Sequence, residues 1–394
     1  MAPDVSAAAD TAASDPYFTD VHELFRAQVR RFVETEIKPQ AAAWEEAGFV
    51  PREILRRMGE LGFLGIRYPE VYGGSAMDTL ATAVLAEELG RSTFGGFAIT
   101  VLVHTDMASP HLANAGSPAQ QARWMPGIIA GSVITAVAVT EPDAGSDVAG
   151  IRTRATREGD SYVLNGSKMY ITNGVHADLV FVAAKTDPAA KGSRGISIFA
   201  VERGTPGFTV GRALKKHGWL SSDTAELIFQ DCRVAAADRL GEENRGFYAI
   251  MRNFQNERIV LGAQAMGEAQ AMLALTLDWV RGRKAFGATL WDMQVIRHRL
   301  AMLSAEIEAA RRLVYHAAWL DTKGRDCVRE VSQAKALCGE LVNRVAYACQ
   351  QFHGGMGYLR ESTIERMVRD ARVQAIGGGA TEVMLEEVAK RLYV

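Results

Sequence analysis

The fold of this chain is decided by residues 137–174, which read VAVTEPDAGSDVAGIRTRATREGDSYVLNGSKMYITNG. The loop TEPDAGSD at 140–147 gathers hydroxyls, carboxylates and a glycine, a composition that directs backbone N–H groups at a phosphate or a polar ring edge. The segment MYITNG at 169–174 carries large apolar residues into an Asn-Gly turn, as a hairpin strand does. Two such loop edges beside paired strands suit a flat heteroaromatic ligand with a phosphorylated tail. An ordinary hairpin with a Gly-Ser turn is the alternative, because isolated motifs often mislead.

The composition indicates a globular protein of two or three domains. The chain has 394 residues, of which 48% are hydrophobic, so it can bury a sizeable core. Its 44 basic and 46 acidic residues nearly balance, which argues against a nucleic-acid or membrane-surface role. The four cysteines show neither a C-x-x-C pair nor metal-ligand spacing with histidine. We therefore expect buried free thiols and no metal site at Cys232, Cys327, Cys338 and Cys349.

Residues 1–16 are rich in Ala, Asp and Ser and contain no Lys or Arg. We expect a disordered start that is neither a secretory signal, which needs a basic start and an apolar core, nor an arginine-rich mitochondrial presequence. The longest apolar stretch, around 128–139, is interrupted by Gly131, Ser132 and Thr135 and is too short to span a bilayer. A cytoplasmic protein fits these features best.

The hydrophobic period changes twice along the chain. Apolar spacing predicts helices over 21–44, from Pro51 to about residue 64, over 78–88 and over 118–125. Short period-two segments follow at 133–140, 161–164, 179–184, 195–201 and 227–229, and long helical segments at 247–283, 292–322, 328–350 and 381–391. We predict an α+β fold with an N-terminal helical domain at 17–131, a central small antiparallel β-barrel at 132–240 and a C-terminal four-helix bundle at 246–394.

One carboxylate interrupts an apolar helix face. Phe247, Ile250, Phe254 and Leu261 form a stripe at helical spacing, and Glu257 falls on it with Arg258 beside it. Burial of an unpaired carboxylate raises its pKa toward the range useful for a general base. A structural ion pair between helices, made by Glu257 or Arg258, explains the same pattern.

Residues 140–147 and 169–174 together resemble the flavin-binding signature of the acyl-CoA dehydrogenase family, T-E-x-x-x-G-S-D followed by W/Y/F-I-[ST]-N-G. Two later segments continue the resemblance: R-K-A-F-G at 283–287 with Gln294, and QFHGGMGY at 351–358. The resemblance implies FAD and a helix–barrel–bundle fold. The FAD-contacting residues that it implies are Val137, Val139, Thr140, Gly145, Ser146, Tyr170, Ile171, Thr172, Arg283, Phe286, Gln294, Gln351, Gly354, Gly355 and Thr381. Arg283, Phe286 and Gln294 are expected to reach the ADP half of the FAD of a neighbouring subunit. The glycines of 351–358 are expected to let the backbone approach the dinucleotide closely, and Ala380 replaces a threonine that usually contacts FAD.

The resemblance also assigns the base. Most members carry a glutamate where this chain has Gly378, after R-D-A-x-x-x-x-I at 369–376. The long-chain and isovaleryl branches carry it instead on the first bundle helix, in an x-x-E-R segment that Gln255-Asn256-Glu257-Arg258 matches. Glu257 is therefore the expected base, and Glu382 is the rival carboxylate. The backbone N–H of Gly378 is expected to polarise the thioester, and the residues implied in substrate binding are Ser146, Asn256, Arg258 and Gly379.

The activity implied is FAD-dependent introduction of a trans α,β double bond into a medium- or long-chain or branched acyl-CoA, in a homotetramer that reduces an electron-transfer flavoprotein. A flavin oxidase or monooxygenase of the same fold, and a non-catalytic flavoprotein that binds nucleic acid, are the alternatives. The family also places residues 97–110 beside the acyl pocket. His104 within this run is either a satisfied core histidine or a substrate contact.

Overall fold

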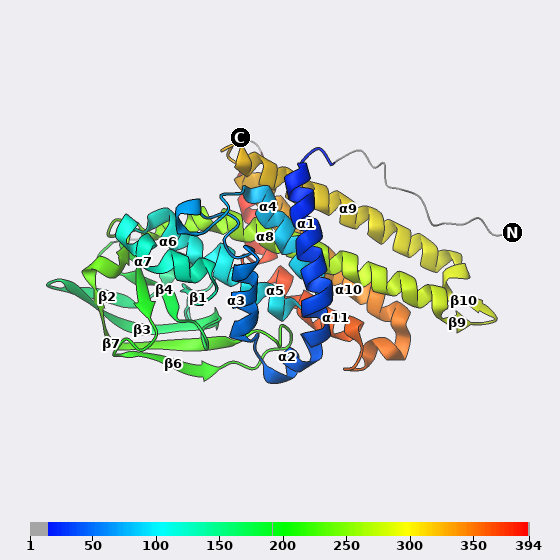
Figure 1. The fold of residues 1–394 in the computed structure, drawn as a ribbon, viewed down its shortest axis with the longest axis horizontal. Coiled ribbons are helices and arrows are strands. Elements are labelled where there is room, and N and C mark those ends of the chain that lie inside the picture. The colour runs from blue at the N-terminus through cyan, green and yellow to red at the C-terminus, as the bar shows by residue number, and fades with distance from the viewer. Residues whose placement is uncertain (1–14, 191, 393–394) are drawn as a thin grey trace.

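The computed structural model describes residues 15–190 and 192–392. Most of the predicted disordered start, residues 1–14, lies outside the described residues. Helices come first, a sheet follows and helices return, in the order that the hydrophobic periods predict (Figure 1). The sheet occupies one end of the molecule and the long helices extend away from it (Figure 1).

The N-terminal region is helical throughout. Its elements are α1 (Asp20–Phe32), η1 (Val33–Ile37), η2 (Lys38–Gln40), α2 (Ala41–Ala47), α3 (Arg52–Glu60), η3 (Glu70–Tyr72), α4 (Thr79–Gly90), α5 (Gly95–Leu102), η4 (Val103–Ala108), α6 (Ser109–Ala115) and α7 (Pro118–Ile129). The prediction of one helix over 21–44 is wrong. A π-helical turn and a 3-10 turn interrupt it, since Pro39 has no N–H to continue the ladder.

The middle region is one eight-stranded sheet. Its strands are β1 (Thr135–Ala138), β2 (Arg154–Glu158), β3 (Ser161–Thr172), β4 (Leu179–Lys185), β5 (Ile196–Glu202), β6 (Phe208–Ala213), β7 (Thr224–Ala235) and β8 (Arg239–Leu240). They lie in the order β6-β7-β3-β2-β4-β5-β8, with β1 beside β4. The pairing is antiparallel as predicted except that β4 pairs in parallel with β1 and β2. The β2–β3 hairpin lies between β1 and β4 in the chain and supplies the crossover that a parallel pair requires.

Strand β4 is apolar on both faces because two different cores cover it. Leu179, Phe181 and Ala183 pack with residues of α7 and α8, whereas Val180 and Val182 pack inside the sheet domain with β3, β5 and β7. Alternate side chains of a strand point to opposite faces, so a continuous apolar run marks a strand that is buried on both sides. The sheet is thereby fixed against the helices.

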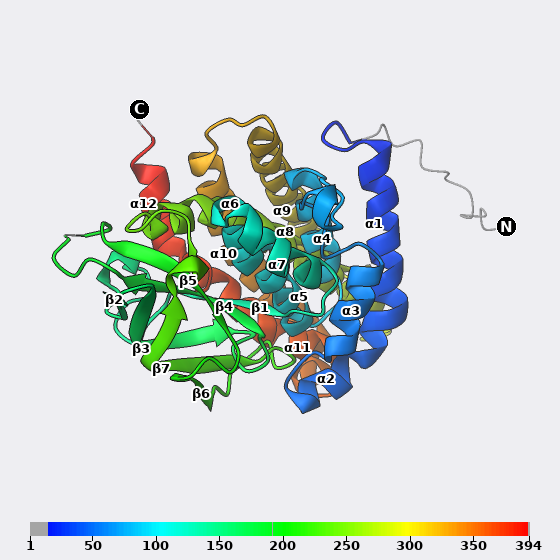
Figure 2. The ribbon, with the colours of Figure 1, turned by 60° about the vertical axis from the view of Figure 1, so that its left-hand side comes forward.

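The C-terminal region contains α8 (Gly246–Gly282), the small hairpin β9 (Lys284–Ala285) and β10 (Ala288–Thr289), and then η7 (Leu290–Asp292), α9 (Gln294–Thr322), α10 (Val328–His353), η8 (Gly354–Tyr358), α11 (Thr363–Ala371), η9 (Arg372–Ala375) and α12 (Thr381–Ala389). Helices α8, α9 and α10 lie side by side, and α4 also packs along α8 (Figure 2). Helix α11 was not predicted. No helix of the described residues is both long and apolar enough to cross a membrane, and all four cysteines are buried and free.

The contact between α4 and α8 depends on glycines. A Cβ atom at Gly267 would lie 2.0 Å from the carbonyl oxygen of Glu87, and one at Gly90 would lie 2.3 Å from that of Gln264. Both obstacles are backbone atoms, which cannot turn aside as a side chain does. These glycines therefore set how closely the N-terminal helices approach the helix that carries Glu257.

We expect the Gly267→Ala substitution to destabilise the protein by about 1–3 kcal/mol, because the added methyl group forces α4 and α8 apart. Intrinsic helix propensity alone would make the alanine variant more stable by about 1 kcal/mol. A loss of stability would therefore show that the steric overlap outweighs helix propensity. Gly282→Ala is the control, since a Cβ there meets nothing within 4 Å. Urea unfolding of both variants measures the difference; equal stabilities would contradict the close packing.

Candidate active site

Strand β3 holds the TEPDAGSD loop in place. The N–H of Met169 donates to the carbonyl of Thr140 at 2.9 Å. The ammonium of Lys168 donates to the carbonyl of Val139 at 2.9 Å and to Glu141 Oε1 at 2.8 Å. Two successive residues of the strand thus bind three successive residues of the loop, and the two predicted flavin segments lie side by side.

Lys168 and Glu141 form a buried ion pair that the sequence analysis missed. Burial opposes ionisation of Glu141, but Lys168 and the backbone N–H of Arg152 outweigh it and hold the pKa of the carboxyl below its usual value. Burial lowers the pKa of Lys168 to about 8, against the opposing effect of Glu141. A single lysine in a strand carries no sequence signal of this role.

The predicted cofactor residues of this region differ in exposure. Gly145 and Ser146 are exposed, and Val137, Thr140 and Thr172 are half-buried. The side chains of Val139 and Ile171 lie in the hydrophobic core, so only their backbone can face a ligand. Tyr170 is 66% exposed and has a φ of 61°, at a bulge between Lys168 and Ile171. The bulge turns the aromatic ring out of the sheet.

Glu257 is buried on α8, with only 7% of its surface exposed. Its Oε1 accepts a hydrogen bond from Asn253 Nδ2 at 3.0 Å. Its Oε2 makes no hydrogen bond within the described residues and is not fully enclosed. Neither Glu257 nor Arg258 forms an ion pair with another described residue within 4.0 Å, so the structural ion pair that the sequence left open is not formed there. One oxygen of a buried carboxylate is therefore free to accept a proton.

The electrostatics favour the protonated form of this carboxyl. Burial raises the pKa of Glu257 to about 8, and Asp106 adds to the rise, while Asn253 and the nearby Arg258 oppose it. A carboxyl in this range can take up and release a proton near neutral pH, as a general base must.

The π-helical turn η4 holds the part of α8 that carries Glu257, through hydrogen bonds to Asn253 and Asn256. The amide of Asn253 donates to the carbonyls of Met107 and Asp106, and that of Asn256 donates to the Asp106 carbonyl at 2.9 Å. A π-turn shifts the helical hydrogen-bond pattern, and such turns often mark functional sites. The two asparagines, one turn from each other on α8, thereby fix the helix face that carries Glu257.

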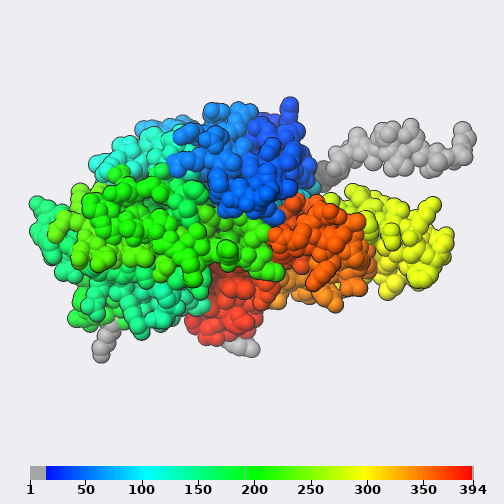
Figure 3. Space-filling view, turned by 90° about the horizontal axis from the view of Figure 1, so that it is seen from below, coloured from blue at the N-terminus to red at the C-terminus, as the bar shows by residue number. Residues whose placement is uncertain are grey.

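The Gly377–Gly379 turn lies over the same face. Gly378 has a φ of 61° and Gly379 a φ of 101°. A Cβ atom at Gly378 would lie 2.1 Å from Cδ1 of Leu261, which is one turn, about 6 Å, beyond Glu257 on α8. The N–H groups of Gly378 and Gly379 donate to no acceptor in the described part of the chain. From below, the C-terminal segment lies between the sheet domain and the bundle (Figure 3).

The remaining candidates are placed differently. Glu382 is exposed in the first turn of α12, and the Thr381 hydroxyl donates to Glu340 Oε1 at 2.8 Å. His104 is fully buried, with Nε2 at 3.0 Å from the Ile128 carbonyl and Nδ1 at 3.0 Å from the Thr135 hydroxyl. Burial lowers the pKa of His104 to about 4. His104 is therefore a core histidine with both ring nitrogens hydrogen-bonded, rather than a substrate contact.

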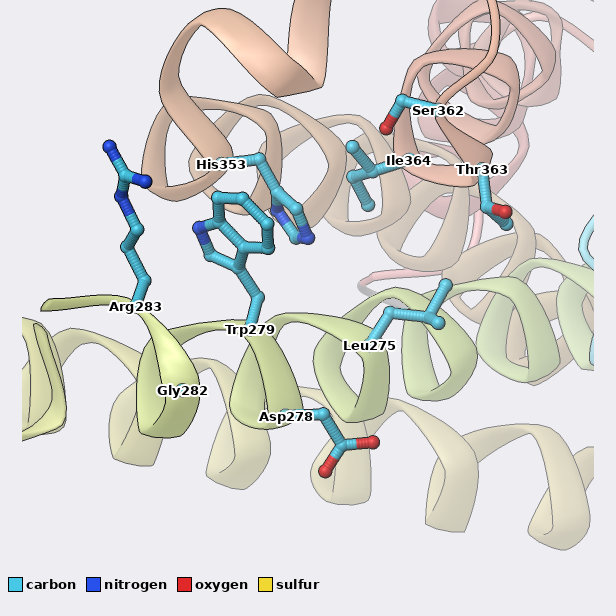
Figure 4. A pocket seen from close by; sticks show the side chains of 9 residues that line it. All are labelled: Leu275, Asp278, Trp279, Gly282, Arg283, His353, Ser362, Thr363 and Ile364. Atoms are coloured by element: carbon cyan, nitrogen blue, oxygen red, sulfur yellow. The ribbon is translucent and has the colours of Figure 1, made fainter. Parts of the chain in front are cut away.

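The second predicted cofactor group lies at the distal tip of the bundle (Figure 1). Arg283, Trp279 and His353 line a cavity of about 480 Å³, and the rings of Trp279 and His353 stack at 5.1 Å between centroids (Figure 4). The other members of this group, Phe286, Gln294, Gln351, Gly354 and Gly355, are exposed, and Phe286 is 98% exposed. Within one chain this group does not meet the loop at 137–146.

The chemical character of these residues suits FAD. Near the sheet are a flat exposed ring at Tyr170, free hydroxyls and an open backbone at Gly145, where a Cβ atom would meet nothing within 4 Å. At the distal tip a guanidinium and stacked rings border a cavity suited to a purine and a phosphate. The separation of the two groups is compatible with one FAD held between two chains. Among the described residues no cluster of His, Cys, Asp and Glu could hold a metal ion.

Comparison with known proteins identifies the family. The acyl-CoA dehydrogenase N-terminal, middle and C-terminal domain families match residues 19–132, 136–232 and 244–393. The long-chain specific acyl-CoA dehydrogenase of Mus musculus is 42% identical over 376 residues, which cover 95% of this chain and 87% of that protein. The isovaleryl-CoA dehydrogenase of Oryza sativa is 34% identical over 385 residues, covering 97% and 94%.

The crystal structure of an acyl-CoA dehydrogenase from Geobacillus kaustophilus superposes with a TM-score of 0.92 at 43% identity and covers 96% of this chain and 100% of that one. Sequence, domain order and fold agree over nearly the whole length. The chain therefore belongs to the acyl-CoA dehydrogenase family, whose members are FAD-dependent oxidoreductases.

Proposed function

We propose that this protein dehydrogenates an acyl-CoA thioester between Cα and Cβ, with Glu257 as the base that removes the α-proton. The observation that carries the proposal is the buried Glu257 carboxylate, whose pKa is raised to about 8 and whose Oε2 has no partner in the described chain. The Gly377–Gly379 turn, which lies against Leu261 and Arg258 of the same helix, offers two backbone N–H groups that donate to no acceptor among the described residues. Removal of an α-proton requires a base near the α-carbon and hydrogen-bond donors to the carbonyl oxygen of the bound thioester.

FAD, when bound, supplies the acceptor for the β-hydrogen and its electron pair. The residues proposed to hold it are Val137, Val139, Thr140, Gly145, Ser146, Tyr170, Ile171, Thr172 and Thr381, with Arg283, Phe286, Gln294, Gln351, Gly354 and Gly355 contributed by a neighbouring subunit. Val139 and Ile171 would contribute through their backbone. The Lys168–Glu141 pair would keep the loop in register beneath the ring system.

The Gly378 N–H is proposed to donate to the thioester oxygen. Negative charge develops on that oxygen as the α-proton leaves, and a fixed donor stabilises it more in the transition state than in the ground state. A side chain at position 378 would require Leu261 to move, because Leu261 fills the space behind the glycine. The packing of Leu261 therefore leaves no place for a glutamate at position 378, which agrees with a base on α8 instead.

Arg258 and Asn256 are proposed to contact the substrate together with Ser146 and Gly379. The guanidinium of Arg258 is largely buried and makes no hydrogen bond within the described residues, and burial lowers its pKa. Asn256 Oδ1 is also buried without a partner. Unpaired buried polar groups are costly, so a polar ligand that satisfies them gains affinity.

The substrate class proposed is a medium- or long-chain or branched acyl group. The relatives named for long-chain and isovaleryl substrates support it. An electron-transfer flavoprotein is the proposed electron acceptor, and a homotetramer is the proposed assembly.

The Glu257→Gln substitution should abolish turnover, by a factor of at least about 10³, because an amide cannot accept the proton. FAD content and acyl-CoA affinity should remain close to wild type. Glu268→Gln is a matched control: Glu268 lies on the same helix, is equally enclosed and also has its pKa raised to about 8 by burial. Single-turnover flavin absorbance measures both, and undiminished turnover in Glu257→Gln would place the base elsewhere.

The reaction rate should rise with pH up to about 8. Glu257 accepts the proton only when ionised, and its raised pKa means that the ionised fraction falls about tenfold for each pH unit below that value. Pre-steady-state rates at saturating substrate between pH 6 and 9.5 measure this profile, and Glu268→Gln should reproduce it. A rate independent of pH across this range would contradict the assignment.

Anaerobic titration of the FAD-loaded protein with acyl-CoAs of different length and branching should bleach the flavin with long or branched chains and not with acetyl-CoA. The length at which bleaching is fastest defines the substrate class. Rapid reoxidation of the reduced protein in air would instead favour a flavin oxidase of the same fold.

A further inference from the structure

Lys335 on α10 is a buried cation directly beneath the glycine turn. Only 2% of its surface is exposed. Its ammonium donates to the carbonyl of Gln374 at 2.6 Å and to that of Gly379 at 3.3 Å. The Lys335 side chain also runs below Gly378, since a Cβ atom at Gly378 would lie 4.0 Å from Lys335 Cε.

No carboxylate compensates this charge directly. Within the described residues Lys335 forms no ion pair within 4.0 Å, and its two hydrogen-bond acceptors are neutral carbonyls. Burial lowers its pKa to about 8. An ammonium in such surroundings costs free energy unless it is well hydrogen-bonded, so its presence needs a reason beyond packing.

The turn has few other anchors. At its start, the N–H groups of Ile376 and Gly377 both donate to the Val373 carbonyl at 2.8 Å. Gly377, Gly378 and Gly379 have no side chains to pack, and the positive φ values of Gly378 and Gly379 lie in a region that glycine enters and leaves freely. Lys335 joins the carbonyl that precedes this segment to the carbonyl at its end.

We propose that Lys335 is a positioning residue that fixes the Gly378 and Gly379 N–H groups toward the thioester oxygen and adds positive potential there. The inference rests on the proposed function and deepens it. Two effects act together: the ammonium holds the two peptide groups that flank the Gly378 and Gly379 N–H groups, and its charge, in surroundings of low dielectric, favours the negative charge that develops on the oxygen. Lys335 itself does not touch the substrate.

The test uses a thioester in which sulfur replaces the β-methylene group. Its α-proton can be removed, but no hydride can leave from the β-position. Exchange of the α-protons with D₂O, followed by proton NMR on the FAD-loaded protein, reports proton removal without turnover. Calorimetry gives the affinity of the same compound separately.

Lys335→Met should slow α-proton exchange at least about tenfold while affinity for the analogue changes less than about threefold. The reason is that the positioned N–H groups and the positive charge stabilise the transition state more than the bound ground state. Lys335→Gln, which keeps a donor but not the charge, should recover part of the rate. Leu341→Ala is the control for a merely structural effect: it empties a buried position of the same helix and should leave exchange near wild type.

The variants separate this inference from the proposed function. Exchange in Lys335→Met and Lys335→Gln within about threefold of wild type, with none in Glu257→Gln, overturns the role of Lys335 and leaves the base in place. Exchange that persists in Glu257→Gln but falls in Lys335→Met removes the base assignment and retains the positioning role. Exchange that persists in both Glu257→Gln and Lys335→Met overturns both the base assignment and the positioning role.

Discussion

The burial of one carboxylate on the long helix α8 is the constraint on which the site depends. Glu257 has lost its hydration, and no cation within ion-pair distance compensates it among the described residues. The surrounding structure provides a single amide donor, Asn253, which is itself fixed by carbonyls of the π-turn η4. The N-terminal helices and the bundle must therefore meet closely for the carboxyl to keep its raised pKa. The glycine contacts between α4 and α8 allow that approach.

A second constraint comes from the Gly377–Gly379 turn, which packs against the same helix. The Leu261 side chain stands where a side chain at position 378 would begin, so the turn there is backbone only. This gives a physical reason why glycine stands at position 378 in a chain whose proposed base, Glu257, lies on α8. The same absence of side chains leaves the turn without packing of its own, and the buried Lys335 ties together the two carbonyls that flank it.

Much of this could be predicted from the sequence, because strong periodic patterns and a long motif carry it. The helices of the bundle and the strands at 179–185 and 196–202 follow from their apolar runs. Strands β2 and β6 were missed because their side chains are largely exposed and charged or small, which leaves no clear alternation. The break of the first helix at Pro39 had a signal that was overlooked.

Single polar residues could not be predicted, since their role depends on what the fold brings near them. Lys168 and Lys335 look like ordinary surface lysines in the sequence, yet both are buried against backbone carbonyls beside the site. The separation of the Arg283 segment from the TEPDAGSD loop was expected, because the resemblance already assigns Arg283 to the FAD of a neighbouring subunit; the hairpin β9–β10 that follows Arg283 lies far from the sheet (Figure 1). The family resemblance supplied residue roles that periodicity alone leaves open, such as the choice between Glu257 and Glu382.

The most direct test of this account is a crystal structure of the FAD-loaded protein with the thioether acyl-CoA analogue. The account predicts a Glu257 carboxylate oxygen about 3–3.5 Å from the α-carbon. It also predicts the thioester oxygen about 2.7–3.1 Å from the Gly378 nitrogen. An α-carbon nearer to Glu382 or to any other carboxylate, with Glu257 turned away, would contradict it.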